Sequence, residues 1–135
     1  MANILVIDDD KLFVTLMVHT LTKHGHQVAF AFDGATGTRA FAKARFDAVV
    51  CDMVMPEQEG VQTIRQMRAE QPDIAIVAIS GGLSFSHSSK IDVLDIAKRL
   101  GADVTLKKPF QLSELVAAVD QALASRNSAQ TAAQG

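Results

Sequence analysis

The stretch "ILVIDDD", residues Ile4 to Asp10, decides the fold. Four branched apolar residues are followed directly by three aspartates. The apolar run is typical of a buried strand. Two carboxylates about 4 Å apart repel by roughly 4 kcal/mol at an effective dielectric constant of about 20. A strand that ends in clustered negative charge therefore predicts a cation where the strand ends.

Four more short apolar runs follow, each after a helical pattern, and they predict further strands. These runs are Gln27–Phe32, Asp47–Cys51, Ile74–Ile79 and Asp103–Leu106. The predicted helices comprise a first one that stops at Gly25, then Gly34–Ala44, Gly60–Glu70, Lys90–Leu100 and Gln111–Ser125. Apolar strands that alternate with helices indicate an α/β fold with a five-stranded parallel sheet covered on both faces.

Length and composition indicate one domain. The chain has 135 residues and a formal net charge of -2, so we expect a single core and no direct binding of nucleic acid. We expect one domain over residues 1–125 and a disordered tail over residues 126–135. The single cysteine, Cys51, stands inside an apolar run and predicts a buried thiol. No apolar run approaches a membrane span, which predicts a soluble cytoplasmic protein.

Chemically active side chains follow the predicted strands. In an open parallel sheet, ligands bind at the carboxyl ends of the strands, where these side chains should meet. Carboxylates, a hydroxyl and an ammonium predict a Mg²⁺ site that also binds phosphate oxygens. Asp52 could accept a phosphoryl group as an acyl phosphate, while Ser80 and Lys108 contact its oxygens. The side chains are Asp8, Asp9, Asp10, Asp52, Ser80, Lys107 and Lys108. Strand alternation favours Lys108 over Lys107.

Four motifs make the chain recognisable. "VIDD" (Val6–Asp9), "CDMVMP" (Cys51–Pro56), "AIS" (Ala78–Ser80) and "KKPF" (Lys107–Phe110) together resemble the response-regulator receiver family of two-component signalling. The resemblance implies a flavodoxin-like, doubly wound (βα)5 fold. It also implies a signalling phosphoacceptor rather than an enzyme, one that promotes its own phosphotransfer and dephosphorylation. The implied phosphodonor is a sensor histidine kinase or a histidine phosphotransfer protein, and the implied output is an unknown downstream protein.

The resemblance also assigns roles to residues. It implies that Asp52 is the phosphoacceptor, Asp9 a direct Mg²⁺ ligand and Asp8 a ligand that acts largely through water. The backbone carbonyl of Val54 would be another metal contact. Ser80 is implied as the switch hydroxyl, and Lys108 as the lysine before a proline whose peptide bond is often cis. Asp10 is expected near the start of the first helix, outside the site.

Three departures from the family pattern shape the expectations for signalling. Thr105 stands where the family often has an aromatic switch, and the segment Gly81–Ser89, "GGLSFSHSS", is longer than usual. We expect this segment, with Phe85, to belong to a phosphorylation-sensitive partner surface with the fourth helix, fifth strand and fifth helix. No output domain follows Ser125, so the chain is expected to be a stand-alone receiver.

Other functions are compatible with some of these residues. Asp8 and Asp10 have the Asp-x-Asp spacing of haloacid-dehalogenase-like phosphatases, although such an enzyme would leave Asp52 unexplained. A binding module that works without phosphorylation is a third possibility. His24 and His26 could form a metal pair, but a solvated turn around Gly25 is the preferred interpretation.

Overall fold

The structure is a computed structural model, and it describes residues 2–53, 59–80, 97–99 and 101–134. Its centre is a five-stranded sheet with the strand order β2-β1-β3-β4-β5, and every neighbouring pair is parallel. The strands are β1 (Asn3–Ile7), β2 (Gln27–Ala31), β3 (Ala48–Asp52), β4 (Ala75–Ser80) and β5 (Val104–Lys107). The predicted five-stranded parallel sheet is therefore confirmed.

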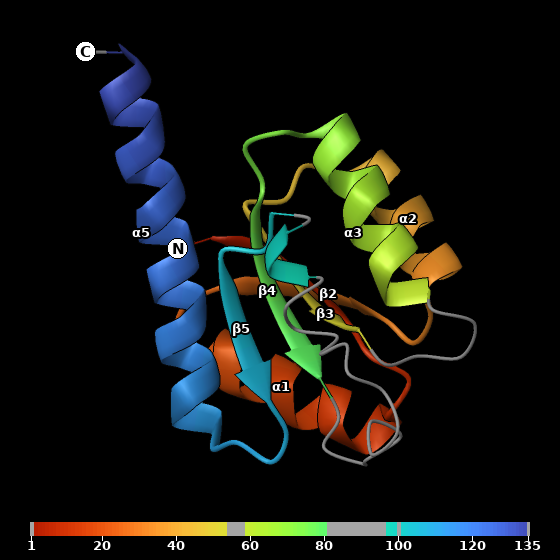
Figure 1. Ribbon diagram of the computed structural model, residues 1–135. Coiled ribbons are helices and arrows are strands. Elements are labelled where there is room, and N and C mark those ends of the chain that lie inside the picture. The colour runs from red at the N-terminus through yellow and green to blue at the C-terminus, as the bar shows by residue number, and fades with distance from the viewer. Residues whose placement is uncertain (1, 54–58, 81–96, 100, 135) are drawn as a thin grey trace, which may run out of the picture.

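Helices cover both faces of the sheet (Figure 1). α1 (Lys11–Lys23) and α5 (Leu112–Gln134) lie on one face, and α2 (Gly34–Lys43) and α3 (Glu59–Glu70) lie on the other. Of the predicted fourth helix, residues 97–99 are helical and the rest lies outside the described residues. No helix in the described ranges has the length and apolar character needed to cross a membrane.

Alternation along the strands builds two cores, one on each face of the sheet. In β1, Ile4 and Val6 pack toward α1 and α5, whereas Leu5 and Ile7 pack toward α2 and α3. All four side chains are fully buried. Burial of each stabilises the fold by about 1.5–3 kcal/mol, so both faces hold β1 at the centre of the sheet. Cys51 is buried as predicted, and burial raises the pKa of its thiol.

Aspartates cap the helices that follow β1 and β2. Asp10 is the N-cap of α1, and its carboxylate accepts a hydrogen bond from the backbone N–H of Phe13 at 3.1 Å. Asp33 caps α2 in the same way through the N–H of Thr36 at 2.7 Å. That bond lowers the pKa of Asp33. The predicted position of Asp10 at the start of the first helix is confirmed.

The end of α5 differs from the expectation. The helix continues to Gln134, although we expected helix only to Ser125 and a disordered tail after it. Arg126 explains the first added turn, because its Nε lies 3.0 Å from Oδ1 of the half-buried Asp103. Residues 127–134 include neither glycine nor proline, and their alanines and glutamines favour helix. The division into a domain and a separate tail is not tested by this helix.

His26 is buried, which corrects the expectation of a fully solvated His24–His26 turn. The Nδ1 atom of His26 accepts a hydrogen bond from the backbone N–H of Ala2 at 3.1 Å, so the neutral ring carries its proton on Nε2. Nε2 lies 4.0 Å from Oδ1 of Asp120 on α5. Gly25 has a φ of 100°, which fits the predicted left-handed cap of α1.

We expect His26 to make the fold less stable in mild acid. Burial lowers the pKa of His26, and the nearby charge of Asp120 only partly opposes this. The unfolded chain therefore takes up a proton below pH 6.5, while the folded chain stays neutral to a lower pH. The free energy of unfolding should fall as the pH drops through that window, and level off below the folded pKa. Urea titrations of wild type and His26→Gln measure the difference. The exposed control His24→Gln should keep the wild-type pH dependence, and an equal pH dependence in His26→Gln would contradict the assignment.

Candidate functional site

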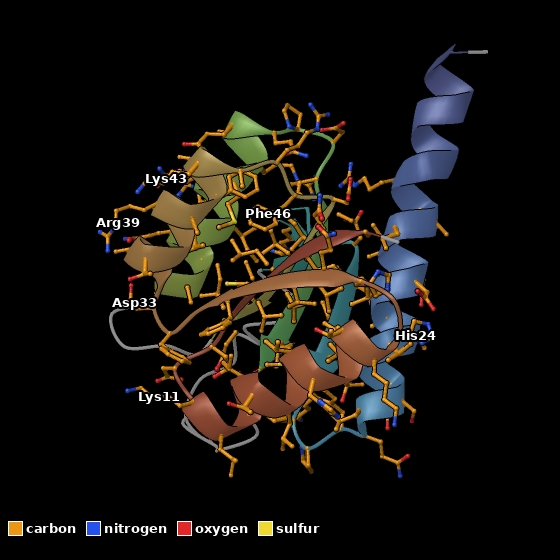
Figure 2. The ribbon with its side chains drawn as sticks, turned by 180° about the vertical axis from the view of Figure 1, so that it is seen from behind. Lys11, His24, Asp33, Arg39, Lys43 and Phe46 are labelled. Carbon is orange, nitrogen blue, oxygen red and sulfur yellow. The ribbon has the colours of Figure 1, made fainter. Side chains whose placement is uncertain are left out.

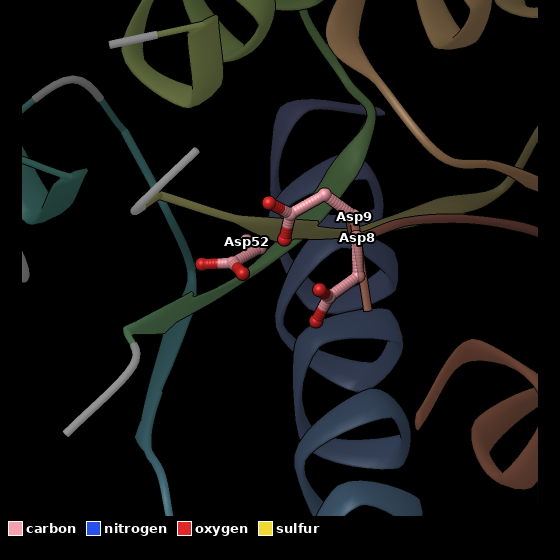
Figure 3. Close-up of side chains that lie close together, drawn as sticks. All are labelled: Asp8, Asp9 and Asp52. Carbon is pink, nitrogen blue, oxygen red and sulfur yellow. The ribbon is translucent and has the colours of Figure 1, made fainter. Parts of the chain in front are cut away.

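Three carboxylates meet at the carboxyl ends of the two central strands. β1 lies between β2 and β3, so the direction of strand addition reverses beside it, where open parallel sheets bind ligands. Asp8 and Asp9 follow β1, and Asp52 is the last residue of β3. Each offers a carboxylate oxygen, and these oxygens lie within 4.8 Å of one another (Figure 3). The predicted convergence of the three acids is thus present in the structure.

The three carboxylates differ in exposure. Asp8 is fully buried and Asp52 is 3% exposed, whereas Asp9 is exposed to solvent. One Asp8 oxygen accepts the backbone N–H of Asp10 at 2.9 Å. Partial burial, together with the negative charge of Asp8, raises the pKa of Asp9. The site therefore combines two inward carboxylates with an outer one that is accessible to an incoming ion.

Lys108 supplies positive charge to this cluster. Its Nζ lies 2.9 Å from Oδ2 of Asp8 and 3.5 Å from Oδ2 of Asp52. Burial alone would lower the pKa of Lys108, but the hydrogen bond from Lys108 to Asp8 and the charge of Asp52 outweigh it and the pKa is raised. Lys107 is exposed, so Lys108 rather than its neighbour reaches the acids. The positive charge of Lys108 offsets part of the repulsion expected among the neighbouring carboxylates.

Ser80 connects the site to β5. It is the last residue of β4, it is half-buried, and its backbone carbonyl accepts the N–H of Lys108 at 2.8 Å. The peptide bond between Lys108 and Pro109 is cis, as the resemblance implied. Thr105 is half-buried in the middle of β5, opposite Ala78 of β4. Because Ser80 and Lys108 share a backbone hydrogen bond, a displacement of one would reach the other.

Gly60 is a site residue that the sequence reasoning missed. It lies in the first turn of α3, where a Cβ would stand 2.6 Å from Cα of Met53 and closer still to the carbonyl oxygen of Asp52. No side chain fits there without moving the backbone of the phosphoacceptor candidate. No local signal marks this residue, because Gly60 is the first residue of the predicted helix Gly60–Glu70 and glycine is common where helices begin.

The cluster fits a small divalent cation. Its donors are all carboxylate oxygens, and one of them is accessible from solvent, which suits Mg²⁺ with several retained waters. Two other features predicted from the sequence lie outside the described residues. They are the Val54 carbonyl and the segment Gly81–Ser89 with Phe85.

Known proteins similar to this chain agree with the geometry. Residues 4–120 match the response regulator receiver domain. The chain belongs to that family. Receivers of this family are signalling phosphoacceptors of two-component systems, and they generally bind Mg²⁺ through acidic residues and interact with histidine kinases or phosphotransfer proteins.

The curated relatives are longer than this chain, so the receiver matches only part of each. The chain is 35% identical to the DNA-binding transcriptional regulator NtrC of Azospirillum brasilense over 122 residues, 90% of this chain and 24% of that protein. It is 36% identical to the transcriptional regulatory protein PrrA of Mycobacterium tuberculosis over 129 residues, 96% of this chain and 53% of that one. The receiver thus spans about half or less of these relatives.

A solved structure matches over nearly its whole length. The response regulator receiver domain protein from Clostridium thermocellum superposes with a TM-score of 0.80 at 26% identity. That superposition covers 94% of this receiver and 98% of the other chain. The flavodoxin-like fold class is confirmed.

The phosphatase alternative does not fit this receiver. Its Asp-x-Asp pair would need Asp8 and Asp10 to face the same ligand. Asp10 instead caps α1 through the N–H of Phe13, and the carboxylate cluster contains Asp8, Asp9 and Asp52. The second aspartate of the Asp-x-Asp spacing is therefore a helix cap and not part of a phosphatase site.

Proposed function

We propose that this receiver takes a phosphoryl group from a phosphohistidine protein onto Asp52, with Mg²⁺, and that the phosphorylated form binds a different protein partner. The donor is a sensor histidine kinase or a histidine phosphotransfer protein, and the exchange takes place in the cytoplasm. The observation that carries the proposal is the Asp52 carboxylate, 3% exposed, with an ammonium at 3.5 Å and two further carboxylates within 4.8 Å. No direct contact with nucleic acid is proposed.

In the proposed transfer, an Asp52 oxygen forms a bond to phosphorus as the P–N bond to the donor histidine breaks. The electron pair of that bond returns to the imidazole nitrogen of the donor, and because the other ring nitrogen carries a proton, the histidine leaves as a neutral imidazole. Lys108 pairs with a phosphoryl oxygen as a positive charge, and the Ser80 hydroxyl donates to another. Asp8 and Asp9 would hold Mg²⁺, which when bound neutralises charge on the phosphoryl oxygens. Hydrolysis of the acyl phosphate by water ends the signal.

The proposed output begins at Ser80. When Ser80 moves toward the phosphoryl group, its carbonyl moves too, and this carbonyl accepts the N–H of Lys108. The change would reach β5 and the start of α5 through that bond. Thr105 has no ring to report such a change, so the partner surface is proposed to include the segment Gly81–Ser89.

A phosphotransfer assay tests the proposal. A histidine kinase labelled with radioactive phosphate on its histidine is mixed with the receiver and Mg²⁺, and the label on each protein is followed over time. Transfer to the receiver that EDTA prevents and Asp52→Asn lacks would support the proposal. Failure with a panel of phosphorylated kinases and with acetyl phosphate would reject it.

Magnesium should bind weakly and through Asp9. We expect a dissociation constant of about 1 mM, or about -4 kcal/mol, because several ligands are waters. Asp9→Ala removes the accessible carboxylate and should weaken binding beyond detection, as measured by amide chemical shifts during a Mg²⁺ titration. Asp33→Ala is the control, since that carboxylate caps α2 and lies outside the cluster. An unchanged affinity in Asp9→Ala would remove Asp9 from the ligands.

Lys108→Ala should separate phosphorylation from signalling. We expect acetyl phosphate to modify the variant within about tenfold of the wild-type rate, because Lys108 contacts the phosphoryl group without forming a bond to it. The phosphorylation-dependent change in amide hydrogen exchange along β5 and α5 should be lost. Lys107→Ala is the matched control at the exposed neighbouring position. A wild-type exchange response in phosphorylated Lys108→Ala would contradict the role.

A further inference from the structure

One aromatic ring stands beside the ammonium group of the site, and a second ring packs against the first. Nζ of Lys108 lies over the ring of Phe13 on α1, 4.7 Å from its centroid. The ring of Phe110, two residues beyond Lys108, meets Phe13 edge to face with the centroids 5.4 Å apart and the planes at 67°. The rings therefore join α1 to the β5–α5 connection at the functional lysine.

Among the described residues, the ring of Phe13 joins two carboxylates around the ammonium. Lys108 has a carboxylate oxygen of Asp8 at 2.9 Å, one of Asp52 at 3.5 Å and the face of Phe13 as its third neighbour. Its side chain is 22% exposed. A cation over an aromatic face is attracted by the negative face of the ring, and this attraction strengthens as water is excluded. The three neighbours hold the ammonium between the two carboxylates rather than in solvent.

Packing alone does not account for this ring. The fully buried stripe of α1 consists of Val14, Met17 and Leu21, and Phe13 lies beside that stripe as a partly buried residue. Leucine at residue 13 could supply similar apolar contact with the core on this face of the sheet. A leucine has no π face, however, and could not attract the ammonium.

We propose that Phe13 is a positioning residue of the receiver site: its ring holds the Lys108 ammonium where a phosphoryl group on Asp52 would meet it. Phe110 supports Phe13 through the edge-to-face contact. The functional part of this inference rests on the proposed phosphorylation of Asp52. The geometric part, the ammonium over the ring, holds with or without that reaction.

A chemical shift measurement tests the geometry without any phosphorylation. Protons held over a ring face are shifted upfield, so the Lys108 ε-methylene protons should resonate upfield of the other lysines in wild type. The shift should vanish in Phe13→Leu and persist in Phe13→Tyr, which keeps a ring. Phe30→Leu is the control, because Phe30 is 52% exposed on β2 and pairs with Phe32 instead. An ordinary Lys108 shift in wild type, or one unchanged in Phe13→Leu, would overturn the proposal.

A double-mutant cycle tests the positioning role. The phosphoryl mimic beryllofluoride is titrated with Mg²⁺ into wild type, Phe13→Leu, Lys108→Met and the double variant. We expect Phe13→Leu to weaken binding about threefold to tenfold, the range of a partly buried cation–π contact, and to have no further effect once Lys108 is replaced. Phe13→Tyr should restore wild-type affinity. An equal loss in both backgrounds would show a merely structural role, and wild-type affinity in Phe13→Leu would also reject the inference. If no variant, wild type included, binds beryllofluoride, the proposed function fails while the shift measurement still decides the geometry.

Discussion

Replacing Asp52 by asparagine is expected to abolish phosphorylation of the chain by acetyl phosphate. The amide keeps the shape of the side chain but lacks the negative oxygen that would attack phosphorus. Asp52 is buried at the end of β3, with Lys108 at 3.5 Å, and a neutral group there relieves repulsion with Asp8 and Asp9. The variant should therefore fold normally and remain unmodified. Intact mass spectrometry after treatment with acetyl phosphate and Mg²⁺ measures both forms.

Asp10→Asn is the matched control for that experiment. Asp10 belongs to the same run of aspartates but caps α1 through the N–H of Phe13, and asparagine caps helices about as well. The control should be phosphorylated at the wild-type rate with unchanged stability. Wild-type phosphorylation of Asp52→Asn would mean that another carboxylate is the acceptor.

Replacing Gly60 by alanine is expected to be the most destabilising of the conservative changes considered. The added Cβ would overlap the carbonyl oxygen of Asp52 and stand 2.6 Å from Cα of Met53. These are backbone atoms, so no rotamer change relieves the overlap, and α3 or the end of β3 must move. We expect the free energy of unfolding to fall by about 3 kcal/mol or more and phosphorylation to slow, because the Asp52 carboxylate moves with its backbone.

Gly37→Ala is the control for Gly60. Its Cβ would also be crowded, at 2.5 Å from Cδ1 and 2.9 Å from Cγ1 of Ile7, but these are side-chain atoms that can shift without moving the backbone of Asp52. The loss should be about 1 kcal/mol, with phosphorylation unchanged. Urea denaturation and the acetyl phosphate assay give both numbers. Equal stability losses in the two variants would contradict the argument that the backbone of Asp52 limits the position of α3.

Much of the fold could be predicted from local patterns. Each strand is a short apolar run, and the parallel sheet follows from the alternation of such runs with helices. The meeting of Asp8, Asp9, Asp52 and Lys108 was predictable for the same reason, since all four lie at or just beyond the carboxyl ends of strands that share one edge of the sheet. The motifs around these residues are also typical of the receiver family.

The remaining features depend on tertiary contacts that no local pattern encodes. Gly60 is required by the approach of α3 to the backbone of Asp52, and His26 is buried because it accepts the N–H of Ala2. The longer α5 begins its extension with an ion pair between Arg126 and Asp103, residues 23 positions apart. Phe13 and Lys108 are much further apart in sequence, and the packing of α1 beside α5 brings them together.

The central claim is that Asp52, and not a neighbouring carboxylate, carries the phosphoryl group. Peptide mapping of the receiver after acetyl phosphate and Mg²⁺, with reductive trapping of the acyl phosphate by borohydride, locates the modified residue. The account predicts a single modified aspartate at Asp52, and none in a sample treated with EDTA. Modification at Asp8, with Asp52 untouched, would contradict it.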